Sequence, residues 1–109
     1  MKKAVVLFIV FAFSCFVAAL TLAGEESGMK KGEQLFSEHC AACHPNGGNI
    51  IDPEDTLQKK TLTSHGIKTA DDIVGYLREP GTGMPAFDKE KLPDEQAREI
   101  AEYILDTFK

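Results

Sequence analysis

Apolar side chains recur at helical spacing near the end of the chain. They occupy positions i, i+3, i+4, i+7, i+8 and i+11 of one segment, which places them on one face of an α-helix: Ala97, Ile100, Ala101, Ile104, Leu105 and Phe108. Pro93 and the acidic pair Asp94 and Glu95 suit the start of a helix, where negative charge is favourable. The pattern predicts an amphipathic helix over residues 94–108.

Three further segments show helical patterns. Residues 29–43 place Leu35 and Phe36 among charged side chains, as an amphipathic helix does. Residues 69–79 begin with Thr69 as a helix cap, and residues 55–62 suit a short helix. Glycine, asparagine and proline at 46–49 and 52–53 predict turns. No strand pairing, repeat or low-complexity segment is evident, so the fold class we predict is all-α, with three or four helices.

The N-terminal residues follow a different pattern. Lys2 and Lys3 precede a nearly continuous apolar run that reaches Leu20, and small residues follow at 21–24. A basic start, an apolar stretch and a small-residue cleavage site are typical of a signal peptide for export. We expect cleavage after Ala23, so that residues 1–23 are a signal peptide and residues 24–109 form one exported domain in the periplasm.

Two other interpretations of this segment exist. An apolar run of this length could span a bilayer, so a retained membrane anchor stays open. Lipidation at Cys15 is disfavoured, because Phe13 stands where a small or aliphatic residue is expected and another apolar run follows. If the signal is cleaved, no stable membrane insertion is expected.

Composition and charge narrow the function classes. With 43% hydrophobic and 27% charged residues, the 109-residue chain is typical of one globular domain. Loss of Lys2 and Lys3 leaves ten basic residues against seventeen acidic ones and takes the formal net charge from −5 to −7. Such a chain repels polyanions, so nucleic acid is excluded as a partner. A domain this short often needs a covalent staple or a cofactor to stabilise its core.

Three candidate functional residues, two cysteines and a histidine, lie in the motif Cys40-Ala41-Ala42-Cys43-His44. This C-x-x-C-H pattern is the attachment site of c-type haem. Two thiols three positions apart can each form a thioether to a vinyl group of the porphyrin, and the adjacent imidazole then lies under the iron. The motif predicts one covalent haem c on Cys40 and Cys43, with His44 as an iron ligand.

Other uses of the two cysteines fit less well. A thioredoxin-like dithiol belongs to a βαβ unit, and no strand pattern precedes Cys40. A zinc site would need a second pair of cysteines or histidines, which the sequence lacks. A plain disulfide would leave His44 without a role.

The second axial position of a haem iron separates electron transfer from gas or peroxide chemistry. Met84 is our candidate, because Gly81 and Gly83 let the backbone approach a flat ring and Pro85 fixes the chain beyond it. Met29 precedes the motif too closely and is better interpreted as a packing residue. His39 adjoins Cys40 and cannot easily reach the opposite face of the ring. His65 lies in a turn-like stretch, and ligation by two histidines stays open through it.

Taken together, the motifs resemble class I cytochromes c, most closely cytochrome c6 and its bacterial relatives. The resemblance covers nearly all of the mature chain and rests on Leu35-Phe36, the C-x-x-C-H motif, Gly47-Gly48-Asn49, residues 56–60, residues 84–87 and residues 100–105. It implies a cytochrome c fold wrapped around the haem, with an exposed haem edge near Cys40. It also implies that Gly32 and Phe36 cross the last helix near Tyr103.

The resemblance implies a monomeric one-electron carrier between redox protein partners. Because no acid–base pair flanks Met84, we expect a carrier rather than an enzyme. A haem sensor or peroxidase, in which Met84 leaves the iron, is the rival class. Pro45 and the two glycines around Thr82 depart from the photosynthetic pattern, and so the donor and acceptor are not identified by the resemblance.

Overall fold

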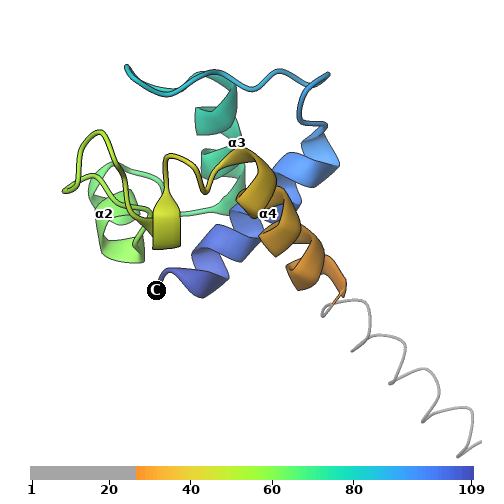
Figure 1. The fold of residues 1–109 in the computed structure, drawn as a ribbon, viewed down its shortest axis with the longest axis horizontal. Helices are drawn as coiled ribbons and strands as arrows, with labels where there is room; N and C mark the ends of the chain where they lie inside the picture. The colour runs from red at the N-terminus through yellow and green to blue at the C-terminus, as the bar shows by residue number, and fades with distance from the viewer. Residues whose placement is uncertain (1–26) are drawn as a thin grey trace, which may run out of the picture.

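The computed structural model describes residues 27–109. The predicted signal peptide, residues 1–23, lies outside the described residues. A first helix extends over residues 27–39, and a single 3-10 turn, η1, follows at Pro45–Gly47. Three further helices are α2 at Lys59–Ser64, α3 at Ala70–Arg78 and α4 at Asp94–Thr107 (Figure 1). No strand occurs in residues 27–109, and the predicted all-α class is confirmed.

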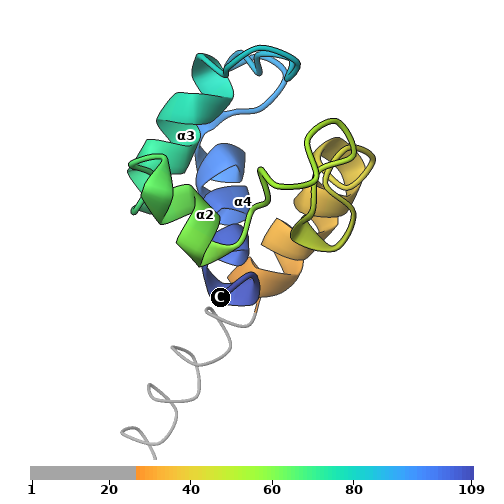
Figure 2. The ribbon, with the colours of Figure 1, turned by 90° about the vertical axis from the view of Figure 1, so that its left-hand side faces the viewer.

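The helices are arranged around α4. Figure 2 shows α4 between the first helix on one side and α2 and α3 on the other. The buried face of α4 consists of Ala97, Ile100, Ala101 and Ile104, as its apolar pattern predicts. Each buried leucine or isoleucine contributes about 1.5–3 kcal/mol to folding. The remaining core side chains come from the first helix and the residue after it, from α2 and α3, and from the segment before α4: Leu35, Phe36, Cys40, Leu62, Ile73, Leu77 and Leu92.

The first helix crosses α4 at a glycine. A Cβ atom on Gly32 would lie 2.4 Å from the carbonyl oxygen of Glu99 and 2.9 Å from Cβ of Tyr103. No side chain fits between the two backbones at that distance. Phe36 packs one turn further along, with its ring centroid 5.4 Å from that of Tyr103 and 5.5 Å from that of Phe108. The predicted crossing of Gly32 and Phe36 with the last helix is therefore confirmed.

The first helix is shorter at its end than its sequence predicts. It ends at residue 39, whereas the prediction extended it to Cys43. The amide of Ala41 donates to the carbonyl of Phe36, which also accepts from Cys40, so the regular i to i−4 ladder stops there. The C-x-x-C-H motif therefore lies in a turn that follows the helix rather than in its last turn.

Helix α3 begins with a reciprocal cap, and the predicted role of Thr69 is confirmed. The Asp72 amide donates to Thr69 Oγ1 at 3.1 Å, while Asp72 Oδ2 accepts from the Thr69 amide at 2.9 Å. Hydrogen bonds from the backbone amides of Lys68 and Thr69 hold the pKa of Asp72 below its ordinary value. This cap orients α3, whose buried face carries Ile73 and Leu77.

The short second helix is displaced from its predicted position. It begins at Lys59 rather than Asp55, because residues 55–58 are engaged elsewhere. The amide of Leu57 donates to the Gly47 carbonyl at 2.8 Å, and that of Lys59 donates to the Phe108 carbonyl at 2.8 Å. These long-range bonds hold the segment in a non-helical path until residue 59. Among residues 27–109, no helix has the length and apolar character needed to cross a bilayer.

Candidate functional site

A cavity of about 300 Å³ opens between the helices and the long loops. The cavity is lined by all four predicted haem-binding residues: Cys40, Cys43, His44 and Met84. Met84 reaches it from the loop that joins α3 to α4, far along the chain from the other three. The apolar part of its wall comes from several elements: Leu57, Leu62, Ile67, Ile73, Leu77 and Ile104.

The Cys40–His44 turn is held by its own backbone. The His44 amide donates to the Cys40 carbonyl at 2.9 Å, and the Cys43 amide donates to the same oxygen at 3.2 Å. The chain then bends sharply at Asn46 (φ +54°) and Gly47 (φ +76°), which form η1. A Cβ on Gly47 would lie 2.5 Å from the Phe108 ring, so glycine is required there both by conformation and by space.

The imidazole of His44 is oriented by one hydrogen bond. Its Nδ1 lies 2.7 Å from the Gly48 carbonyl oxygen, which can only accept. The ring proton therefore lies on Nδ1, and Nε2 keeps its lone pair available for a metal. Such a bond to the second ring nitrogen is typical of histidines that ligate a metal.

The two cysteines differ in their surroundings. Cys40 is buried, Cys43 is exposed, and no disulfide joins them. Burial, with a smaller contribution from Cys43, raises the pKa of the Cys40 thiol to about 11. A thiolate-based dithiol exchanger needs the opposite shift, so this site does not suit thioredoxin-like chemistry. Nor do residues 27–109 contain any cluster of three or more histidine, cysteine or acidic side chains that could hold a metal such as zinc.

Met84 is placed by a loop without regular structure. It is partly buried against the hydrophobic core, and Gly83 before it has φ +93°, a conformation that favours glycine. Only Ile51 Cδ1, at 3.9 Å, lies near the position of a Cβ on Gly83. The glycine here therefore serves the path of the backbone rather than a close contact.

Of the three alternative iron ligands, one lines the cavity and two do not. His65 also lines the cavity, from the C-terminal cap of α2, and its Nε2 lies 3.7 Å from Asp55 Oδ1. Its side chain is 56% exposed, as expected for the turn residue that the sequence predicts. His39 does not line the cavity; its ring packs edge-on against Phe87 at 6.1 Å. Met29 lies on the first helix away from the cavity.

Sequence reasoning missed several residues of the site. Asn49 organises the loop beside the cavity, because its Oδ1 accepts from the amides of Ile51 and Asp52 and its Nδ2 donates to the Asp55 carbonyl at 3.0 Å. Tyr76 lines the cavity as well, although its position in α3 predicts only ordinary packing. The motif Asn-Gly-Gly-Asn marked the first loop as a turn but gave no sign of this network.

The residues present fit a haem. Two thiols with the spacing of a thioether motif, an imidazole with a free Nε2 and a thioether sulfur surround one cavity with an apolar wall. These are the donors by which cytochromes hold haem iron. An all-helical domain with such a site belongs to the class of c-type cytochromes.

Comparison with known proteins agrees with this class. Residues 27–104 match the family model described as cytochrome c oxidase, cbb3-type, subunit III. Cytochrome c6 of Thermostichus vulcanus is 37% identical over 97% of this chain and 93% of its own length. Cytochrome c6 of Pyropia yezoensis is 38% identical over 95% of this chain and 92% of its own length.

Solved structures give the same result. Outer membrane cytochrome F (OmcF) of Geobacter sulfurreducens is 45% identical and matches with a TM-score of 0.70, over 72% of this chain and 99% of its own. Cytochrome c6 of the diatom Phaeodactylum tricornutum is 39% identical, with a TM-score of 0.66, over 72% of this chain and 91% of its own. The chain belongs to the cytochrome c family. Its cofactor class is haem c, its partners are redox proteins, and it is an electron carrier rather than an enzyme.

Proposed function

We propose that this protein carries single electrons by means of one haem c, bound covalently by Cys40 and Cys43 and ligated by His44 and Met84. The observation that carries the proposal is that the motif and Met84, forty positions after His44 in the sequence, line the same cavity. When bound, the haem supplies an iron that alternates between the ferric and ferrous states by gaining or losing one electron.

The chain's own residues account for the rest of the function. Nε2 of His44 is available because Nδ1 donates to Gly48, and the thioether of Met84 is a soft, neutral donor. A neutral sulfur ligand and an apolar wall both favour the less charged, reduced state, so we expect a clearly positive potential. Ligands held in place in both oxidation states keep the atomic rearrangement on electron transfer small.

We also propose that the protein is exported. Residues 1–23 act as a signal peptide that is removed after Ala23, and residues 24–109 act in the periplasm, or in the thylakoid lumen if the host is an oxygenic phototroph. The acidic mature domain, with a formal charge of −7, meets basic or neutral patches on its redox partners as a monomer. The mass of the exported protein tests this route: a mass that includes residues 1–23 would contradict it.

Substitution of Met84 tests the ligand. In Met84→Ala we expect an altered ferric absorption spectrum, a lower potential in a redox titration and binding of imidazole to the ferric iron. Met29→Ala is the matched control, because it removes a methionine that does not line the cavity, and its spectrum and potential are expected to stay unchanged. A ferric spectrum that is identical in Met84→Ala and the parent protein would overturn the assignment.

The histidine alternative is tested in parallel. Because His65 also lines the cavity, His65→Ala should leave the spectrum unchanged if Met84 is the ligand. Loss of the low-spin spectrum in His65→Ala would instead support ligation by two histidines. Rapid binding of carbon monoxide to the reduced parent protein at neutral pH would favour a sensor over a carrier.

A further inference from the structure

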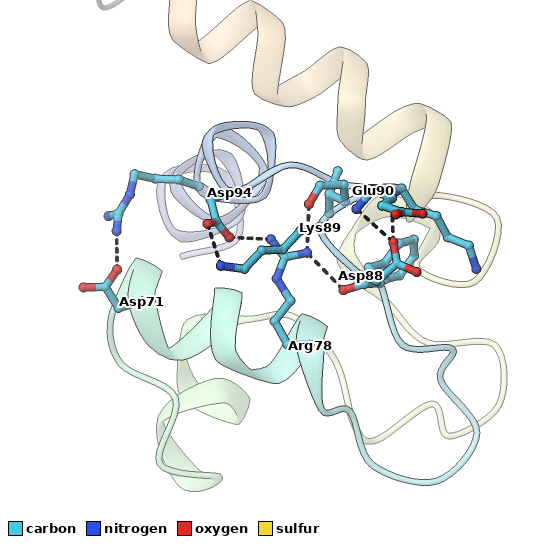
Figure 3. Close-up of polar contacts among 10 residues, drawn as sticks. Asp71, Arg78, Asp88, Lys89, Glu90 and Asp94 are labelled. Atoms are coloured by element: carbon cyan, nitrogen blue, oxygen red, sulfur yellow. Dashed lines mark hydrogen bonds and ion pairs between the residues drawn. The ribbon is translucent and has the colours of Figure 1, made fainter.

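Arg78, at the end of α3, makes three polar contacts with the segment that leads from the Met84 loop into α4. Its Nη1 donates to the backbone carbonyls of Phe87 at 3.0 Å and Leu92 at 2.8 Å (Figure 3). Its Nη2 donates to Asp94 Oδ1 at 2.8 Å. The side chain is only 18% exposed. A charged group is therefore held largely out of water, and its bonds go mainly to backbone atoms.

The loop that carries Met84 depends on its ends for its position. Within the described part of the chain, residues 80–86 form no hydrogen bond with any other segment. The loop is closed where the Phe87 amide donates to the Leu77 carbonyl at 2.9 Å. Arg78 binds the carbonyl of the same residue, so Phe87 is fixed through both of its backbone polar groups. Met84 lies three positions before this anchor.

Arg78 also joins this anchor to the start of α4. Between its two carbonyl acceptors the chain makes a tight turn, in which Asp88 Oδ1 accepts from the amides of Glu90 and Lys91 at 3.0 and 2.8 Å. The Leu92 amide closes the turn on the Asp88 carbonyl at 2.9 Å. The guanidinium of Arg78 thus bonds to the residues on both sides of the turn, Phe87 and Leu92.

The geometry of these bonds requires arginine. The two carbonyls and the carboxylate are reached by two nitrogens of one planar group. A lysine has a single nitrogen and cannot reproduce such a fork. Arg78 Nε is buried without a hydrogen-bond partner among the described residues, which adds to the cost of burial. The three bonds through Nη1 and Nη2 offset that cost.

We propose that Arg78 is a positioning residue for Met84: by fixing Phe87 to the start of α4, it keeps the thioether at the cavity. The proposal rests on the proposed function, in which Met84 ligates the iron. Without Arg78, the loop between Leu77 and Phe87 opens more often. An exogenous ligand can then compete with Met84, because its apparent affinity follows the fraction of open protein.

The test uses the haem-loaded protein as it is exported and imidazole as the competing ligand. In Arg78→Gln we expect the apparent affinity of the ferric protein for imidazole to rise about tenfold, the change that corresponds to the loss of a charge-assisted hydrogen bond. We also expect a weaker methionine-to-iron charge-transfer band and a lower potential. Arg78→Lys, which keeps the charge, should show part of the same change and remains informative if Arg78→Gln does not fold.

Arg98→Gln is the matched control. Arg98 also pairs with an aspartate across α3 and α4, since its Nη2 contacts Asp71 Oδ1, but it does not bond to the loop. Both substitutions remove one arginine–aspartate pair between the same two helices. An equal rise in imidazole affinity in Arg78→Gln and Arg98→Gln would show a general loosening and overturn the proposal. A rise confined to the Arg78 variants supports it.

A third variant separates the carbonyl bonds from the ion pair. Asp94→Asn removes the carboxylate but leaves the bonds from Nη1 to Phe87 and Leu92. We expect an imidazole affinity close to that of the parent protein; an effect as large as that of Arg78→Gln would contradict the role of the carbonyl bonds. Failure of Met84→Ala to change the spectrum would overturn the ligand assignment itself, whereas a change in Met84→Ala with none in Arg78→Gln would overturn only the role of Arg78.

Discussion

The two sides of the cavity are held in different ways. On the His44 side, the fixing bonds are local: the His44 amide bonds to Cys40, its ring bonds to Gly48, and the Ile50 amide returns to the Cys43 carbonyl at 3.0 Å. On the Met84 side, within the described part of the chain, residues 80–86 form no hydrogen bond with any other segment, and the loop is fixed by contacts with α3 and α4. The first side is held mainly by hydrogen bonds within residues 40–50, and the second by bonds at the two ends of its loop.

This difference has an energetic meaning. The turn on the His44 side is buried at Gly47 against the Phe108 ring, so it should open together with the fold, whereas a loop held at its ends can open while the helices stay intact. We therefore expect damage on the His44 side to appear as lost global stability. Damage on the Met84 side should appear first as exchange of the iron ligand.

The largest effect on global stability is expected from Gly47→Ala. The residue has φ +76°, and an added Cβ would meet the Phe108 ring at 2.5 Å. Strain and overpacking together should lower the free energy of unfolding by about 2–4 kcal/mol in denaturant titrations. The control is Gly66→Ala, which has φ +79° but nothing within 4 Å, and should cost only about 1–2 kcal/mol. Equal losses in the two variants would show that the contact with Phe108 is unimportant.

Gly83→Ala tests the other side. With φ +93° and only Ile51 nearby, the substitution strains the loop without a clash. We expect imidazole affinity of the ferric protein to rise about tenfold, while the denaturation midpoint changes little. If Gly83→Ala instead lowers global stability as much as Gly47→Ala does, the two sides do not differ as described.

Thr69→Ala should lower global stability without a specific effect on either side of the cavity. Loss of the bond from the Asp72 amide to Thr69 Oγ1 removes half of the α3 cap. The expected loss is about 1 kcal/mol in the free energy of unfolding, with an unchanged spectrum. Thr63→Ala, at an exposed position of α2, is the control and should be nearly neutral.

Low pH should also make the loop that carries Met84 open more often. The hydrogen bond from the backbone amide of Lys91 holds the pKa of Asp88 below its ordinary value of 3.8, and this carboxylate organises the turn between Phe87 and Leu92. Stability from a lowered carboxyl pKa is present above that ordinary value and is lost as the pH falls through the folded pKa. We expect the methionine-to-iron charge-transfer band to weaken between about pH 5 and pH 2, and to weaken less in Asp88→Asn. A band that is constant over this range would contradict the prediction.

The sequence predicted the parts of the molecule that local patterns determine. The face of α4 and the cap at Thr69 depend on residues a few positions apart, and the structure confirms both. One error is the end of the first helix, where the Ala41 amide bonds to the Phe36 carbonyl. The other is α2, which begins at Lys59 rather than Asp55 because the Gly47 carbonyl binds the Leu57 amide and the Phe108 carbonyl binds the Lys59 amide. Arg78 gave no signal, since its acceptors are mainly backbone carbonyls, which a sequence pattern does not show.

The crossing at Gly32 and Tyr103 has a consequence for how the molecule is made. It joins a residue near the start of the domain to one near its end. The contact between the first helix and α4 cannot form until nearly the whole domain has been synthesised. The domain therefore cannot fold progressively as it leaves the ribosome. A chain that stays unfolded until its last helix is complete suits the export that we propose for residues 24–109, because a translocation channel accepts an unfolded chain.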